Sequence, residues 1–154
     1  MELLSARCRV RPFQETDLDA FMDYRNDEKW MIYQGFKGLT KSAYREQLLS
    51  TEPCTAGKQL AIVDRQTDQL IGDLYLRKEG DSAWLGYTIA PAHSRKGYAY
   101  EIIQQVCPYL KTLGINQINA GVLPENIASI HLLKKLGFSH KEFDGVEHIF
   151  VRSL

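Results

Sequence analysis

Three strand-like stretches follow one another closely in the middle of the chain, and they constrain the fold more than any other feature. They span residues 59–64, 70–77 and 83–89. The connections between them, residues 65–68 and 78–81, carry the charged, polar and glycine residues of hairpin turns. Strands joined by such short turns pair antiparallel, because a parallel pair needs a much longer crossover. We therefore expect an antiparallel meander at the centre of the molecule.

Helices and further strands flank this meander. A basic–apolar alternation at residues 7–13 predicts a strand with one solvent-exposed face, whereas residues 26–39 have the pattern of a loop. The remaining predicted elements are helices over 15–24, 40–49, 97–113 and 126–136, and strands over 117–123, 138–143 and 146–152. The series predicts one α+β domain over residues 1–154.

Capping and turn residues predict where several elements end. Thr40 is a plausible N-cap, and Pro53 and Gly57 close the segment that it opens. Pro108 removes a hydrogen-bond donor from the long helix, so we expect a kink or an early break there. The Asp-Gly pair at 144–145 is a strong signal for a hairpin.

Size and charge narrow the classes of function. The 154 residues match one domain and suffice to bury a core without disulfides or a structural metal. Because 19 Lys and Arg residues balance 19 Asp and Glu residues, no overall positive charge attracts a phosphate backbone. We therefore expect no nucleic-acid partner.

The distribution of cysteine, apolar and histidine residues indicates the compartment. Cys8, Cys54 and Cys107 are odd in number and lack CxxC spacing, which argues against a disulfide framework and a cysteine-rich zinc site. No signal-peptide pattern opens the sequence, and no apolar run approaches the ~20 residues of a membrane span. The four histidines have no HExxH-type spacing. These features predict a cytoplasmic protein without a membrane partner or a metal.

The first candidate site is the segment 89–99, Ile-Ala-Pro-Ala-His-Ser-Arg-Lys-Gly-Tyr-Ala, which leads from a strand through a basic turn into a helix. Backbone N–H groups, the helix macrodipole and the cations of Arg95 and Lys96 converge there, and Gly97 allows a close approach. This pattern favours a pyrophosphate site, and an ordinary turn with solvated cations is the alternative. The glycine patterns of the P-loop and of the dinucleotide fold are both absent.

The second candidate site is the segment 124–138. Asn126 and Ser129 stand three residues apart at a helix start and face the same side, where their polar groups can meet a ligand. The alternative is that Asn126 is only an N-cap.

Together, the run from Trp84 to Ala99 and the segment 124–138 resemble the GNAT superfamily of acetyl-CoA-dependent N-acetyltransferases. Residues 7–19 and the 144–145 hairpin resemble its ribosomal-protein-alanine acetyltransferase-like (Rim-type) branch. The resemblance implies a central mixed, mostly antiparallel sheet of about seven strands flanked by about four helices. It also implies acetyl transfer from acetyl-CoA to a primary amine, on a protein N-terminus or a small molecule.

The resemblance also implies a coenzyme A site. The thioester would lie in a splay between the strand ending at Ile89 and strand 117–123, with polar helix residues beside the pantetheine arm. The implied cofactor-binding residues are Ile89, Ala90, Ser94, Arg95, Lys96, Gly97, Tyr98, Ala99, Asn126 and Ser129.

Several positions depart from the family pattern and affect the catalytic assignment. Ser94 and Arg95 stand where Gln or Arg and then Gly are usual, and Leu133 replaces a tyrosine that many members use as general acid. In the Rim-type branch a glutamate just before the final hairpin is the proposed base. Glu142 holds that position, and a solvated strand-end carboxylate is its alternative reading. Ser129 is the second candidate catalytic residue.

The resemblance places the acceptor at the aromatic loop 26–39. Trp30 and Tyr33 are the candidate acceptor-binding residues there, because aromatic faces can receive an ammonium group or an apolar chain. Phe36 lies in the same loop, and at least one of these aromatics should plug the core instead. Trp84, where relatives often carry an acid, is the third candidate for acceptor binding and cannot act as a base.

Two functions stay open. One is an N-acetyltransferase without an acyl-enzyme, because Cys107 beside Pro108 is not placed as a nucleophile. Its catalysis would rest on near-attack geometry and on a strand N–H that polarises the thioester. The other is a catalytically degenerate acyl-CoA-binding sensor or interaction module, which Ser94, Leu133 and Trp84 leave open. The expected partners are acetyl-CoA and an amine acceptor, bound by a monomer or homodimer.

Overall fold

A computed structural model describes residues 2–50 and 57–154 of the chain. Pro53, an expected end of the second helical segment, and Cys54 lie outside the described residues.

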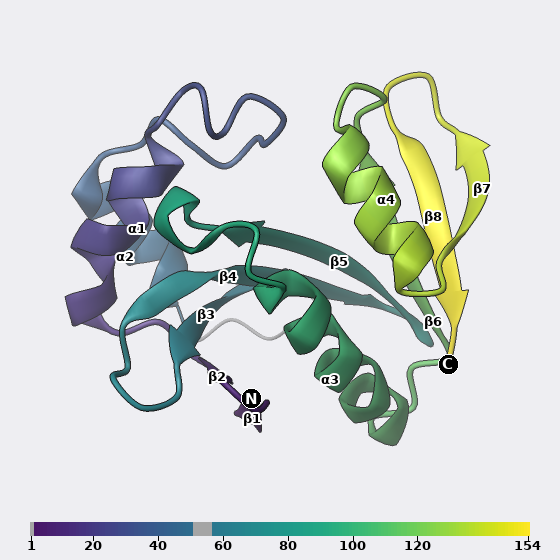
Figure 1. Cartoon of the computed structure of the whole chain (residues 1–154), viewed down its shortest axis with the longest axis horizontal. Helices are drawn as coiled ribbons and strands as arrows, with labels where there is room; N and C mark the ends of the chain where they lie inside the picture. Colours follow the sequence, from purple (N-terminus) through teal and green to yellow (C-terminus); the bar gives the residue numbers. More distant parts are fainter. Residues whose placement is uncertain (1, 51–56) are drawn as a thin grey trace.

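The described residues form an eight-stranded mixed sheet (Figure 1). Its spatial order is β1-β2-β3-β4-β5-β6-β8-β7, and every neighbouring pair is antiparallel except β5–β6. The strands are β1 (Leu3–Leu4), β2 (Cys8–Arg11), β3 (Lys58–Asp64), β4 (Leu70–Glu79), β5 (Ser82–Ile89), β6 (Gln117–Val122), β7 (Ser139–Phe143) and β8 (His148–Ser153). The expected meander is β3–β4–β5, and the expected mostly antiparallel α+β architecture is confirmed.

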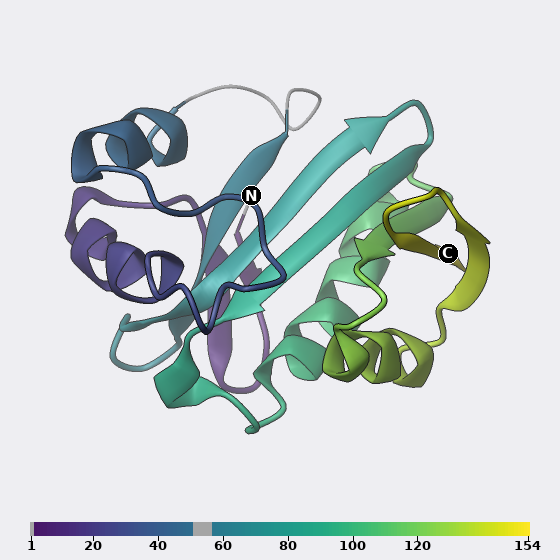
Figure 2. The ribbon, with the colours of Figure 1, turned by 90° about the horizontal axis from the view of Figure 1, so that it is seen from above.

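Helices cover both faces of the sheet (Figure 2). The helices are α1 (Leu18–Arg25), α2 (Lys41–Leu48), α3 (Tyr98–Thr112) and α4 (Ile127–Lys135). Side chains alternate between the two faces of a strand. On β3, Leu60 and Ile62 therefore share a core with α3 and α4, whereas Ala61 and Val63 share one with α1 and α2. Among the described residues, no helix has the length and apolar character needed to span a bilayer.

Several local expectations are confirmed, and others need correction. The Thr40 Oγ1 accepts a hydrogen bond from the Ala43 N–H at 3.2 Å, as an N-cap does. The hairpin at the Asp-Gly pair forms, with residues 144–147 between its strands. A 3-10 turn, Glu15–Asp17, replaces the expected first turn of α1. The two-residue β1 was not expected, because it is too short to show a periodic pattern.

The expected early break at Pro108 does not occur, since α3 continues to Thr112. Pro108 is itself exposed, while Val106, Cys107 and Leu110 around it are buried in the core. Burial of this apolar face on both sides of the proline outweighs the one missing hydrogen bond.

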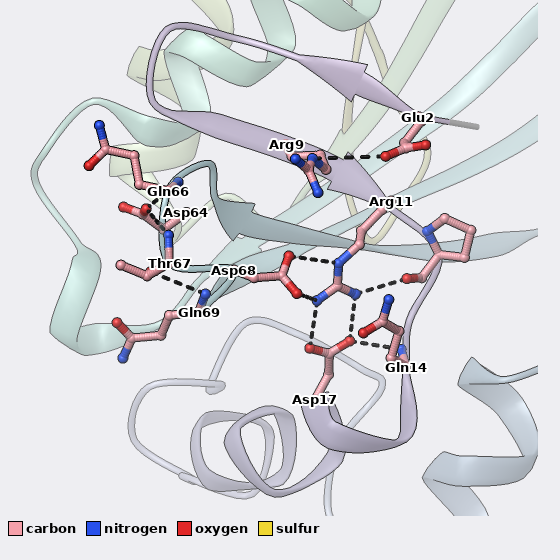
Figure 3. A network of polar contacts seen from close by, with 11 residues as sticks. Glu2, Arg9, Arg11, Gln14, Asp17, Asp64, Gln66, Thr67, Asp68 and Gln69 are labelled. Atoms are coloured by element: carbon pink, nitrogen blue, oxygen red, sulfur yellow. Dashed lines mark hydrogen bonds and ion pairs between the residues drawn. The ribbon is translucent and has the colours of Figure 1, made fainter.

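Arg11 corrects the expectation of a solvent-exposed basic face on the first strand. Its side chain is only 6% exposed and donates to both oxygens of Asp17, at 2.7 and 3.0 Å (Figure 3). It also donates to Asp68 at 3.1 and 3.2 Å. The hydrogen bonds to Asp17 are the main reason that the pKa of Arg11 is raised. Two carboxylates thus balance one buried guanidinium, and they tie β2 to the start of α1 and to the β3–β4 hairpin.

Candidate functional site

The parallel strands β5 and β6 separate along their length (Figure 1). Residues 82–84 of β5 pair with residues 117–119 of β6, and the ladder ends there. A cavity of about 60 Å³ lies beyond that point, lined from β5 by Gly86 and Tyr87 and from β6 by Gly121. We call it the splay cavity. The expected splay between these strands is therefore present.

The end of β5 turns some of its peptide groups toward this opening. The Ala90 N–H donates to the Ile71 carbonyl on the β4 side, at 2.8 Å. The peptide groups of successive residues in a strand point toward opposite neighbouring strands. Those of Tyr87 and Ile89 therefore face the open side. The Ile89 carbonyl accepts a hydrogen bond from the Trp30 indole there, at 2.9 Å. Ile89 and Ala90 are both expected to bind the cofactor. The backbone of Ile89 is turned toward the open side, whereas the Ala90 N–H is already used by the sheet.

The turn that leads into α3 has the shape of an anion site. Gly97 is the N-cap of α3 and has φ of +79°, and Arg95 also has a positive φ of 60°. The first N–H groups of a helix have no partner within the helix, so they remain available to an anion near Tyr98 and Ala99. Arg95 and Lys96 are exposed, while the Ser94 hydroxyl donates to the Pro91 carbonyl at 2.9 Å. The residues of this predicted site therefore come together, with Ser94 supporting the turn.

Arg7, which directly precedes β2, contacts this turn through its side chain. Its guanidinium donates to the Lys96 carbonyl at 2.9 Å and to Glu101 at 2.7 Å, and it lies 4.2 Å from the centre of the Tyr98 ring. Ser5 also donates to the Glu101 carboxylate. Burial raises the pKa of Glu101, but the hydrogen bonds from Ser5 and Arg7 outweigh it, so the net shift is downward. Sequence reasoning missed Arg7, because no local pattern links it to residues some 90 positions away.

The start of α4 brings Asn126 and Ser129 to the splay cavity. The Asn126 Oδ1 accepts from the Ser129 N–H at 3.3 Å, so Asn126 is indeed an N-cap. The Ser129 Oγ lies 2.6 Å from the hydroxyl of Tyr87. Burial is the main cause that raises the pKa of Tyr87, which keeps its proton on the phenol at neutral pH. Tyr87 lies in the run from Trp84 to Ala99, and nothing in that run predicts its hydrogen bond to Ser129.

Glu147 lines the splay cavity, whereas Glu142, the expected base, does not. Glu142 lies on the exposed edge strand β7 and lines none of the cavities described here. Glu147 lines the splay cavity, and its Oε1 would lie 2.8 Å from a Cβ added at Gly121. Burial, followed by the charge of Asp144, raises its pKa.

The hairpin turn explains why Glu147 points here. The Asp144 Oδ1 accepts hydrogen bonds from the N–H groups of Val146 and Glu147, at 2.8 and 2.7 Å. These bonds fix the turn at residues 144–147 and place Glu147 directly before β8, beside β6. If only the Asp-Gly pair is taken as the turn, the sequence gives no reason to prefer Glu147 over Glu142 as the carboxylate at the cavity.

The loop 26–39 closes a second cavity of about 420 Å³, the loop cavity, against the end of β5 and the start of α4. Trp30 and Tyr33 line it, and each is 39% exposed. Phe36 instead packs on the core rings of Phe21 and Tyr44, at centroid distances of 6.0 and 5.4 Å. The expectation that one loop aromatic plugs the core is therefore confirmed.

A third cavity of about 430 Å³, the Asp73 cavity, also borders Tyr87. Gln34 and Tyr87 line all three cavities, so the three spaces meet at these two residues. Asp73 is fully buried and accepts hydrogen bonds from Arg25 at 2.5 Å and from Gln59 at 3.0 Å.

The hydroxyl of Tyr24 also bonds to Asp73. Burial raises the pKa of Asp73 despite the opposing charge of Arg25, and burial also raises the pKa of Tyr24. Sequence reasoning missed this network because its members come from three separate elements.

Other predicted residues lie apart from these cavities. Trp84 sits where β5 and β6 still pair, donates to Glu79 at 2.8 Å and lines none of the three spaces. The rings of His140 and His148 bond to each other at 2.9 Å across β7 and β8. Cys107 is buried in the core, and burial raises its pKa. Within the described residues, no three His, Cys, Asp or Glu side chains are grouped to hold a metal.

Similarity to known proteins agrees with this geometry. Residues 7–139 match the family described as "Acetyltransferase (GNAT) domain". The chain is 36% identical to "Uncharacterized N-acetyltransferase YoaA" of Bacillus subtilis, covering 81% of this chain and 76% of the relative. It is 31% identical to "Probable N-acetyltransferase YjcK" of the same organism, covering 86% and 80%.

Solved structures share the fold at lower sequence identity. A GNAT-family acetyltransferase from Bacillus anthracis has a TM-score of 0.82 and 20% identity, covering 100% of this chain and 98% of that one. A spermidine N-acetyltransferase from Vibrio cholerae, in complex with CoA and spermine, has a TM-score of 0.76 and 22% identity, covering 97% and 95%. With the family match over most of its length, the chain belongs to the GNAT family and is an acetyltransferase.

Proposed function

We propose that the protein transfers the acetyl group of acetyl-CoA to a primary amine, with the reaction centred on the splay cavity. The observation that carries the proposal is that Glu147 and the Tyr87–Ser129 hydroxyl pair line one cavity, where β5 and β6 separate. A carboxylate can accept a proton and a hydroxyl can donate one, as general acid–base catalysis requires.

Coenzyme A would extend from the turn before α3 to this cavity. The pyrophosphate would be bound by the backbone and cations of residues 94–99, braced by Arg7. The pantetheine arm would lie in the loop cavity, with Asn126 at its side and the Ile89 carbonyl as a partner. It would therefore displace the Trp30 indole from that carbonyl.

The amine nitrogen then attacks the thioester carbonyl carbon. A C–N bond forms, the C–S bond breaks and coenzyme A leaves as a thiolate. Glu147 takes the proton from the amine, and its raised pKa makes it a better base than an ordinary glutamate. The Tyr87–Ser129 pair donates a proton to the thiolate sulfur and is reprotonated from solvent. The open N–H of Tyr87 or Ile89 polarises the thioester carbonyl.

The acceptor would enter through the Asp73 cavity and meet the thioester at Tyr87. Structural neighbours include a spermidine N-acetyltransferase and a ribosomal-protein-S5-alanine acetyltransferase, so the fold supports both small and protein acceptors. A cytoplasmic location, a monomer or homodimer, and the Rim-type branch belong to the same proposal.

Thiol release from acetyl-CoA, followed across free-N-terminus peptides, polyamines and aminoglycosides, tests the proposal. We expect acetylated product on at least one acceptor, verified by mass spectrometry. Calorimetric binding of acetyl-CoA without turnover on any acceptor would instead favour the sensor function. No binding at all would exclude both functions.

A further inference from the structure

Glu101 is an acidic side chain close to the turn that the proposed function assigns to the pyrophosphate. It lies one turn into α3, where its backbone N–H donates to the Gly97 carbonyl at 3.0 Å. A negative charge so near a bound phosphate weakens binding by repulsion. The charge of Glu101 is thus unfavourable for the site, and the contacts of its carboxylate show what it contributes instead.

Both oxygens of the Glu101 carboxylate bind the segment that leads into β2. One oxygen, Oε1, accepts a hydrogen bond from the Arg7 Nε at 2.7 Å. The other, Oε2, accepts one from the Arg7 backbone N–H at 2.9 Å and another from the Ser5 hydroxyl. Glu101 therefore holds Arg7 by its backbone and by its guanidinium at once, which fixes where the guanidinium lies.

The guanidinium of Arg7 in turn orients one peptide group of the turn. Its Nη2 donates to the Lys96 carbonyl at 2.9 Å. The peptide between Lys96 and Gly97 is planar and trans, so its N–H points away from its carbonyl. Because Arg7 binds the Lys96 carbonyl, the Gly97 N–H points away from Arg7, where an anion at the start of α3 can accept it.

The turn needs this support because its backbone is strained. Arg95 has φ of 60° and Gly97 has φ of +79°, both in the left-handed region. A residue with a side chain keeps such a conformation only where its surroundings hold it there. Arg7 contacts the chain on both sides of Gly97, through the Lys96 carbonyl and through the Tyr98 ring, whose centre lies 4.2 Å away. These contacts hold the turn in the shape that an anion site requires.

We propose that Glu101 and Arg7 are positioning residues for coenzyme A. Glu101 orients Arg7, and Arg7 holds the turn at residues 94–97 in the conformation that presents N–H groups to the pyrophosphate. The inference rests on the proposed function and adds to it two residues that act through the turn. It also predicts a sign: loss of the negative charge of Glu101 weakens the binding of a polyanion, whereas repulsion alone predicts the opposite.

The Kd of CoA, measured by calorimetry on the full-length protein, separates position from charge in two variants. Glu101→Gln leaves one acceptor oxygen for three donors, so we expect the Kd to rise about fivefold, the scale of one hydrogen bond. Arg7→Lys keeps the cation but cannot bind Glu101 and the Lys96 carbonyl with one planar fork, so we expect a rise of about tenfold. Tighter or unchanged binding in Glu101→Gln, or unchanged binding in Arg7→Lys, overturns the inference and leaves the proposed function standing.

Two controls show whether these losses arise at the turn. Pantetheine lacks the pyrophosphate, so its Kd from an NMR titration should stay within about twofold of the wild-type value in both variants. Arg9→Lys changes an arginine of β2 that faces Glu2 at 3.8 Å, and it should leave the Kd of CoA unchanged. Equal losses for pantetheine and CoA would mean general damage to the site and would overturn the inference. Wild-type protein that binds no CoA overturns the proposed function and the inference with it.

Discussion

Two regions that meet at Tyr87, the proposed coenzyme A site and the Asp73 cavity, are built in different ways. The side assigned to coenzyme A comes mainly from two continuous segments, the turn at 94–99 and the start of α4. The Asp73 cavity is lined by residues from α1, α2, the loop 26–39 and three strands. One side is formed by backbone geometry at helix starts, and the other by side chains held in a buried polar network.

This difference explains what each side can tolerate. A binding site made of helix N–H groups depends on few side chains and keeps its shape as long as the helix begins at the same residue. A wall supported by a buried ion pair fails when one partner is removed, because the other charge is left unpaired. We therefore expect acceptor-side changes to affect folding, and coenzyme-side changes to affect binding.

The largest effect should come from breaking the wall of the Asp73 cavity. Arg25→Met leaves the fully buried Asp73 without its cation, which should lower the free energy of unfolding by about 3–5 kcal/mol. Chemical denaturation measures this loss. Arg45→Met, which removes a solvent-exposed pair with Glu15, should change this free energy far less than Arg25→Met does. Similar losses in both variants would mean that the buried pair does not support the wall.

The next effect separates the two glutamates of the final hairpin. Glu147→Gln should lower kcat/KM by about 10²–10³ and leave the Kd of acetyl-CoA unchanged, because it removes the base but not the binding surface. Glu142→Gln should keep nearly full activity, since Glu142 lies outside the cavities. The opposite pattern would support Glu142 as the base.

The pH profile of the same two variants tests the direction of the pKa shift of Glu147. Activity needs deprotonated Glu147, so kcat/KM should rise with pH through an apparent pKa above that of an ordinary glutamate. That acid limb should persist in Glu142→Gln and disappear in Glu147→Gln. An acid limb that survives in Glu147→Gln belongs to another group.

A smaller effect tests the turn before α3. Gly97→Glu adds bulk and negative charge where the pyrophosphate would lie, and should raise the Kd of CoA by about 30- to 100-fold by calorimetry. Gly80→Glu is the matched control, because Gly80 also has a positive φ but lies in the β4–β5 turn. Both variants share the backbone strain, so equal losses of binding would point to misfolding and not to the anion site.

The smallest effect concerns Trp30. Trp30→Phe frees the Ile89 carbonyl that the pantetheine would use, so the Kd of acetyl-CoA should fall about two- to fivefold, less than the full value of one hydrogen bond. Trp84→Phe removes the bond to Glu79 outside the cavities and should not change this Kd. Weaker binding in Trp30→Phe would show that the indole contributes to the cofactor site.

The sequence predicted the parts of the site that depend on adjacent residues. The turn at 94–99 and the Asn126–Ser129 pair could be identified because a helix start has a local signature. The same holds for the meander, whose short turns dictate antiparallel pairing.

The parts that were missed depend on long-range packing. Asp73 and Arg25 are 48 positions apart, and nothing in either neighbourhood indicates that they pair. Glu147 was missed for a more local reason, because a turn of residues 144–147 and not of two residues decides which glutamate faces β6. Arg11 was expected in solvent because its pattern could not reveal Asp17 and Asp68.

A crystal structure of the protein with bound CoA would locate the sulfur and the pyrophosphate of the cofactor together. The proposed function places the CoA sulfur in the splay cavity beside Tyr87 and the pyrophosphate on the N–H groups at residues 97–99, with the Trp30 indole no longer bonded to Ile89. A CoA molecule whose sulfur lies in the Asp73 cavity, or whose pyrophosphate lies away from the start of α3, would contradict it.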